Sequence, residues 1–164
     1  MNATIVIFGS STGTCEAIAE KIASKLGCKA LNVQDLTADI VKANQNLILG
    51  TSTWGAGELQ DDWYDGLNTL KGCDLSGKTI ALFGCGDCSS YSDTFVGGIG
   101  ELYNGIKGSG AKFIGSVETD GYSFDDSEAV VDGKFIGLPL DDVNEDDKTD
   151  VRIDAWISAI SQDL

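Results

Sequence analysis

Residues 4–26 read TIVIFGSSTGTCEAIAEKIASKL, and this stretch decides the fold. Residues 4–8 are β-branched and apolar on both faces, which is typical of a strand buried inside a parallel sheet. Ile18, Ile22 and Leu26 then recur every fourth residue, so this part of the chain predicts a helix with one buried face. The segment is therefore predicted to be a strand that leads through one turn into a helix.

The turn between them, residues 9–16, carries two glycines and four hydroxyl residues. The first N–H groups of a helix lack intrahelical partners and can bind an anion. A Walker A loop would need Lys after its second glycine, and Gly9 and Gly13 lie four residues apart, which does not match the dinucleotide fingerprint. The turn is therefore either a cradle for a terminal phosphate, made of neutral donors and the helix dipole, or a helix cap without a ligand.

Length and composition predict a single domain over residues 1–164 with one substantial core. The formal charge is −15, from 26 acidic and 11 basic residues, and there is no His. We therefore expect neither nucleic acid nor a membrane as partner, and a basic protein instead. The lack of His excludes a Cys/His zinc site and a His base, and we predict no metal. Without a leader sequence or a membrane-length apolar run, we expect a cytoplasmic protein, or an organellar one after processing.

Strands and helices alternate along the rest of the chain. A polar stretch, residues 118–134, interrupts the alternation, and Pro139 in the segment after it argues for a sheet edge. Alternation implies a parallel sheet with helices on both faces, whose ligands bind where strands end. The loops 9–14, 51–61 and 84–92 should therefore converge. The further predicted strands are 30–33, 46–50, 79–84, 112–117 and 135–140, and the predicted helices are 37–42, one from Asp61, 95–106 and 151–160.

Two of these loops each place one large aromatic residue among small ones. Trp54 lies in TSTWGAGE, residues 51–58, and Tyr91 ends GCGDCSSY, residues 84–91. Either ring alone could simply fold over its own strand. Because both occur together with the phosphate turn, we favour a site in which the two rings sandwich a flat ligand.

The five cysteines are an odd number, which does not favour structural disulfides. Cys85 and Cys88 form a Cys-x-x-Cys, which in a thioredoxin-like protein would open a helix and exchange thiols. The strand and helix pattern here differs from that of thioredoxin. We therefore interpret these two cysteines as small loop residues rather than a working dithiol.

The three loops and the polar interruption resemble a flavodoxin of the long-chain type, over essentially the whole chain. This resemblance implies an α/β fold with a single doubly wound five-stranded parallel sheet. Its strand order is 2-1-3-4-5, of which flavodoxins are a standard example, with helices on both faces and a fifth strand interrupted by an insertion.

The resemblance also implies FMN as cofactor. Residues 10–14 would hold its 5′-phosphate, and Trp54 and Tyr91 would stack on its ring, with Tyr91 as the outer, near-parallel one. Cys15 stands where the family often has Thr, and Thr94 where it often has Asn. The predicted cofactor-binding residues are Ser10, Ser11, Thr12, Gly13, Thr14, Cys15, Thr51, Ser52, Thr53, Trp54, Gly55, Ala56, Gly57, Gly84, Cys85, Gly86, Asp87, Tyr91 and Thr94.

The function implied is a low-potential one-electron carrier with non-covalently bound FMN, an electron-transfer protein rather than an enzyme. It would be a monomer and would serve basic redox proteins, such as an NADP-flavodoxin reductase or a low-potential oxidoreductase. One alternative is an FMN-dependent reductase of quinones or nitro compounds. A non-redox receiver-like domain is less favoured, because it needs acidic residues where Ser10 and Ser11 stand.

Acidic residues near the loops predict where a basic partner docks. Those expected to ring the flavin edge are Glu58, Asp61, Asp62, Asp65, Asp87 and Asp93. A second acidic run, residues 141–150, is either part of the docking face or simply a solvated surface.

Overall fold

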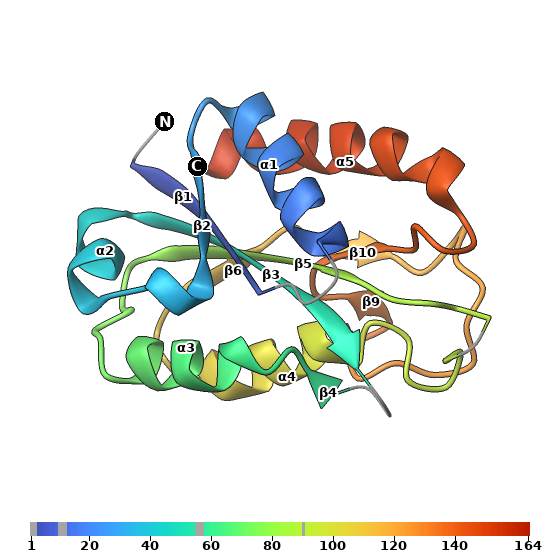
Figure 1. Cartoon of the computed structure of the whole chain (residues 1–164), viewed down its shortest axis with the longest axis horizontal. Helices are drawn as coiled ribbons and strands as arrows, with labels where there is room; N and C mark the ends of the chain where they lie inside the picture. The colour runs from blue at the N-terminus through green and yellow to red at the C-terminus, as the bar shows by residue number, and fades with distance from the viewer. Residues whose placement is uncertain (1–2, 10–12, 55–57, 90) are drawn as a thin grey trace.

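The structure is a computed structural model that describes residues 3–9, 13–54, 58–89 and 91–164. Its central sheet is parallel along its main path (Figure 1). Its spatial order is β2-β1-β3-β5, and both β6 and β10 pair with β5. This arrangement confirms the predicted order 2-1-3-4-5. The strands are β1 (Thr4–Gly9), β2 (Lys29–Asn32), β3 (Asn46–Trp54), β5 (Thr79–Cys85), β6 (Lys112–Ile114) and β10 (Leu138–Leu140).

Two short strands share the fifth position. β6 pairs with the start of β5, where Thr79 lies opposite Lys112, and β10 pairs with its end, where Phe83 lies opposite Leu138. The chain between them forms a separate antiparallel sheet of β7 (Val117–Glu118), β8 (Val130–Val131) and β9 (Lys134–Phe135). The predicted insertion in the fifth strand is therefore confirmed. The strands predicted at 112–117 and 135–140 are shorter than expected, because Val117 pairs with Phe135 in the small sheet instead.

Helices cover both faces of the sheet, as predicted (Figure 1). Alternate residues of β1 serve the two faces: Ile5 and Ile7 pack in the core with α3 and α4, whereas Val6 and Phe8 pack with α1 and α5. A strand buried on both faces explains why residues 4–8 are apolar throughout. The helices are α1 (Thr14–Leu26), α2 (Ala38–Ala43), α3 (Asp62–Lys71), α4 (Gly97–Ile106) and α5 (Asp146–Ile160), with 3₁₀ turns at Val33–Asp35 and Ser161–Asp163.

The strand predicted at 46–50 continues to Trp54, and the helix predicted at 151–160 begins earlier, at Asp146. Two further details of the main elements also differ from the sequence prediction. The end of β3 carries a two-residue antiparallel partner, β4 (Glu58–Leu59), in addition to the parallel strands. α4 begins at Gly97 rather than Phe95, because Val96 adopts a left-handed backbone with φ 45°. Phe95 packs instead against Phe124 and Phe135 of the inserted segment, with ring centroids 5.9 and 6.1 Å apart. The insertion therefore supports the backbone just before α4.

Among the described residues, no helix combines the length and the apolar character that crossing a membrane requires.

Candidate functional site

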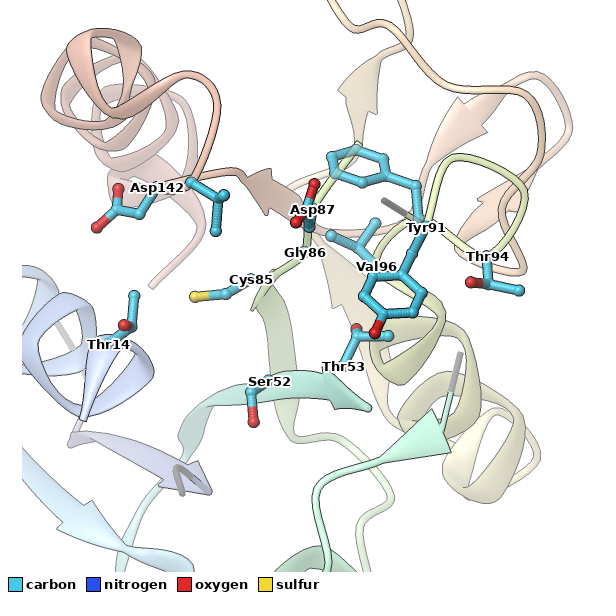
Figure 2. Close-up of a pocket in the computed structure, with 12 residues that line it drawn as sticks. Thr14, Ser52, Thr53, Cys85, Gly86, Asp87, Tyr91, Thr94, Val96 and Asp142 are labelled. Atoms are coloured by element: carbon cyan, nitrogen blue, oxygen red, sulfur yellow. The ribbon is translucent and has the colours of Figure 1, made fainter. Parts of the chain in front are cut away.

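A cavity of about 320 Å³ opens where the central strands end (Figure 2). Four segments form its wall: the end of β3, the start of α1, the segment from β5 to α4 and the turn between β10 and α5. The convergence of loops that the alternation predicted is thus present in the structure. The lining residues are Thr14, Ser52, Thr53, Cys85, Gly86, Asp87, Tyr91, Thr94, Phe95, Val96, Asp142 and Val143.

The N-terminus of α1 forms one end of this cavity. Gly13 precedes the helix with φ 90°, a left-handed conformation that a residue with a Cβ rarely adopts. Thr14, the first residue of α1, lines the cavity. The first N–H groups of this helix and the positive end of its dipole favour an anion there. The predicted Ser10, Ser11 and Thr12 lie outside the described residues.

Cys15 does not face the cavity. Its side chain is fully buried in the core between α1 and the sheet. A hydrogen bond with Cys85, together with burial, raises the pKa of the Cys15 thiol well above its usual value. The prediction that Cys15 belongs to the site can therefore hold only for its backbone N–H, because the side chain packs in the core.

At the end of β3, the structure describes the side chains of three predicted residues, and two of these line the cavity. Ser52 and Thr53 line the cavity, and the Thr53 hydroxyl accepts a hydrogen bond from the Gly98 N–H at 3.1 Å. Thr51 is fully buried, and its hydroxyl donates to the Ser52 carbonyl at 2.8 Å. Thr51 therefore shapes the strand end without facing the cavity. The side chain of Trp54, like Gly55, Ala56 and Gly57, lies outside what the structure describes.

The loop after β5 supplies most of the remaining wall. Cys85, Gly86, Asp87, Tyr91 and Thr94 all line the cavity. Tyr91 is 49% exposed, and its N–H donates to the Asp87 carbonyl at 3.0 Å, which closes the loop on itself. Figure 2 shows its ring extending toward the Thr53 side of the cavity. Such an exposed ring on the rim of a cavity can stack on a flat ligand.

Gly84 stays just beneath this wall and is not part of it. A Cβ at Gly84 would lie 2.6 Å from the Ile99 side chain, so the absence of a side chain lets α4 pack closely on β5. Thr51 and Gly84 face each other across β3 and β5. Both predicted residues therefore support the site rather than line it.

The structure adds four lining residues that the sequence prediction missed: Phe95, Val96, Asp142 and Val143. Asp142 and Val143 follow β10, the strand beside the end of β5. The rule that ligands bind where strands end could have pointed to them. Phe95 and Val96 carried no such signal, because their pattern resembles the start of a helix.

The charge of the lining is negative. Asp87 and Asp142 are the carboxylic acids of the cavity wall, and its described lining residues include neither Lys nor Arg.

Burial and the nearby carboxylate of Asp141 raise the pKa of the Cys88 thiol to about 11, so this thiol stays protonated at neutral pH. All five cysteines are free thiols in the structure. A protonated Cys88 is a poor nucleophile, which supports the interpretation that Cys85 and Cys88 are not a working dithiol.

Fold and cavity together define an open α/β protein that holds a nucleotide-like cofactor where its parallel strands end. The N-terminus of α1 can bind the anionic end of such a ligand, and the exposed ring of Tyr91 can stack on its flat part.

Comparison with known proteins narrows this class. The family model described as flavodoxin matches residues 6–156. Flavodoxin 1 of Azotobacter vinelandii is 44% identical over 97% of this chain and 95% of its own length. Flavodoxin of Helicobacter pylori is 42% identical over 94% of each chain. The crystal structure of Fusobacterium nucleatum flavodoxin bound to flavin mononucleotide superposes with a TM-score of 0.93 at 32% identity, covering 100% of this chain and 99% of that one. The chain belongs to the flavodoxin family.

Proposed function

We propose that this protein is a low-potential one-electron carrier that binds FMN non-covalently and shuttles electrons between redox enzymes. Flavodoxins are electron-transfer proteins rather than enzymes, and the Fusobacterium nucleatum relative binds flavin mononucleotide. The observation that carries the proposal is one cavity bounded by the N-terminus of α1 at Thr14 and by the exposed ring of Tyr91.

The lining residues suit the two parts of FMN. Thr14 and the backbone N–H groups of Gly13 and Cys15 would hold the 5′-phosphate, together with the predicted Ser10, Ser11 and Thr12. Tyr91 would stack on the flavin ring, with the predicted Trp54 on its other face. The edge of the ring would be bordered by Thr53, Gly86, Asp87 and the turn at Asp142. Thr94 also lines the cavity.

The acidic lining would set the redox potential. Bound FMN would supply the one-electron chemistry, and the chain supplies its surroundings. Asp87 and Asp142, with neither Lys nor Arg among the described lining residues, disfavour additional negative charge in the cavity. Each tenfold loss of affinity for the more reduced cofactor lowers a one-electron potential by about 59 mV. The site therefore favours a low potential for the last electron.

The partners we propose are basic redox proteins, such as an NADP-flavodoxin reductase or a low-potential oxidoreductase. The net charge of −15 supports this choice, because opposite charge steers partners together. We further propose that residues 1–164 act as a single domain and as a monomer in the cytoplasm.

The test begins with the flavin itself. We expect purified protein to carry a flavin absorbance spectrum and its apo form to bind FMN more tightly than riboflavin or FAD. Equal affinity for FMN and riboflavin would show that the turn before α1 is only a helix cap. Sustained turnover of NAD(P)H with a quinone or nitro compound by the isolated protein would favour the reductase alternative instead.

A further inference from the structure

The structure describes the side chains of residues 3–9, 13–53, 60–89 and 91–164, and Asp141 is the only buried Asp or Glu among them. Asp141 does not itself line the cavity. It follows β10 directly and lies between two of the loops that do. We propose that Asp141 is a positioning residue, whose carboxylate holds the loop after β5 against the β10–α5 turn and so places Tyr91 for stacking on the flavin. This inference rests on the proposed function.

The two carboxylate oxygens of Asp141 serve different segments. Oδ2 accepts a hydrogen bond from the Cys88 N–H at 2.9 Å. Oδ1 accepts from the Val143 and Asn144 N–H groups at 3.1 and 2.9 Å. One side chain thus binds the backbone of two segments of the cavity wall at the same time: the loop after β5 at Cys88, and the β10–α5 turn at Val143 and Asn144.

Asn144 adds a second bridge between these segments. Its Nδ2 lies 3.0 Å from Asp141 Oδ2 and 2.7 Å from Asp87 Oδ1. The two N–H groups of the amide can therefore bind two carboxylates at once. Asp87 in turn accepts the Ser89 N–H on its side chain and the Tyr91 N–H on its carbonyl, each at 3.0 Å. The chain of hydrogen bonds from Asp141 thus ends at the backbone of the stacking residue.

The charge state of Asp141 suits this role. Burial alone would raise the pKa of its carboxyl, but hydrogen bonds from Cys88 and Asn144 outweigh burial and hold the pKa below its usual value. The carboxylate is therefore ionised at neutral pH and accepts from three backbone N–H groups. A neutral amide of the same shape would turn its own NH₂ toward at least one of those donors. A buried donor without an acceptor is energetically unfavourable, so the contact between the two segments is weakened.

The test is Asp141→Asn, titrated as apo-protein with FMN and, separately, with riboflavin. Because the affected loop touches the ring and not the phosphate, we expect both dissociation constants to rise by the same factor, on the order of tenfold to a hundredfold. Their ratio should stay that of the wild type. Unchanged affinity for both flavins, or a loss confined to FMN, would overturn the inference. A wild-type protein that binds neither flavin would refute the proposed function itself.

Two further variants separate positioning from general destabilisation. Ile106→Val removes a buried methyl group near the end of α4 that lies away from the cavity, and it should lower stability without changing either dissociation constant. Asn144→Ala keeps Asp141 and its backbone bonds but removes the bridge to Asp87, so it should weaken both flavins by a smaller equal factor. It also provides the test if Asp141→Asn does not fold.

Hydrogen exchange of the Cys88 amide gives a second measurement on the apo-protein. The exchange should be faster than in the wild type for Asp141→Asn but not for Ile106→Val. Equal exchange rates in the two variants would also overturn the inference.

Discussion

The hydroxyl of Thr53, at the end of β3, accepts a hydrogen bond from the backbone N–H of Gly98 in the first turn of α4. This contact joins a cavity-lining strand end to the helix behind it, over a distance of 3.1 Å. The approach requires glycine, because a Cβ at Gly98 would lie 2.9 Å from the Ser52 carbonyl oxygen and 3.1 Å from the Thr53 hydroxyl.

Gly98→Ala should therefore push α4 away from β3. We expect a loss of roughly 1–3 kcal/mol in the free energy of unfolding, which is typical of overpacking, together with weaker flavin binding. Urea denaturation of the apo-protein and flavin titration measure the two effects. Gly108→Ala is the matched control, since a Cβ at Gly108 would meet nothing within 4 Å. If the two variants have the same stability and the same flavin affinity, the close approach at Gly98 does not contribute to either.

A second prediction concerns Thr14. If its hydroxyl binds the flavin phosphate, Thr14→Ala should weaken FMN by about 1.5–3 kcal/mol, the usual range for a hydrogen bond to a charged group. Riboflavin lacks the phosphate, so its affinity should not change. Thr69→Ala, in α3 and outside the cavity, controls for the loss of a hydroxyl. A variant that weakens both flavins equally would place Thr14 at the ring instead.

How far the sequence predicts this molecule depends on how local each feature is. The first strand, the first helix and the splitting of the fifth strand follow from short patterns, and all three were predicted correctly. The burial of Cys15 was also within reach, because it precedes Ile18, Ala19 and Ile22 at helical spacing on the buried face. By contrast, Phe95, which precedes the left-handed Val96, packs against the distant Phe124 and Phe135. A long-range contact of this kind leaves no periodic signal.

The Cys-x-x-Cys motif gives a third prediction. The pKa of the Cys88 thiol, raised to about 11, leaves almost no thiolate at neutral pH. The double variant Cys85→Ala, Cys88→Ala should therefore keep its flavin and still accept electrons from an NADP-flavodoxin reductase. Stopped-flow absorbance at equal flavin occupancy is the measurement. Loss of transfer with the flavin retained would restore the dithiol interpretation.

A fourth prediction uses the carboxyl of Glu145, just before α5. The hydrogen bond from Lys148 lowers its pKa, burial opposes this, and Arg152 lowers the pKa further. A carboxyl whose folded pKa lies below its unfolded value stabilises the fold above the unfolded pKa, about 4.3 for Glu, and this stabilisation is lost as the pH falls through the folded pKa. Glu145→Gln should thus be less stable than wild type at pH 7, and the difference should vanish in strong acid.

Urea denaturation from neutral to acidic pH measures this difference. Glu20→Gln, on the exposed face of α1, serves as the control and should change stability little at any pH. If Glu145→Gln remains less stable than the wild type by the same free energy down to strong acid, the loss of stability comes from packing rather than from charge.

The last prediction concerns where a basic partner docks, and we propose a docking face centred on Asp142 rather than on Asp61 and Asp62. Asp61 and Asp62, which the sequence suggested as acids of the flavin edge, lie at the start of α3 and are not among the lining residues. Asp142 from the second acidic run does line the cavity, next to Val143, a residue that is 70% exposed. A carboxylate beside an exposed apolar side chain on the rim suits a basic partner that must approach the flavin closely.

Asp142→Asn should therefore lower the rate of electron transfer from a basic reductase at low salt more than the double variant Asp61→Asn, Asp62→Asn. Raising the salt from about 0.01 to 0.15 M shortens the Debye length from about 30 to 8 Å, so the wild-type rate at limiting concentration should drop steeply. In Asp142→Asn this salt dependence should be flatter. Asp39→Asn, in the first turn of α2 and outside the cavity, has the same change of charge and should behave like the wild type. If Asp39→Asn and Asp142→Asn flatten the dependence equally, only net charge matters to the partner; if the Asp61 and Asp62 pair has the larger effect, the docking face lies at the start of α3.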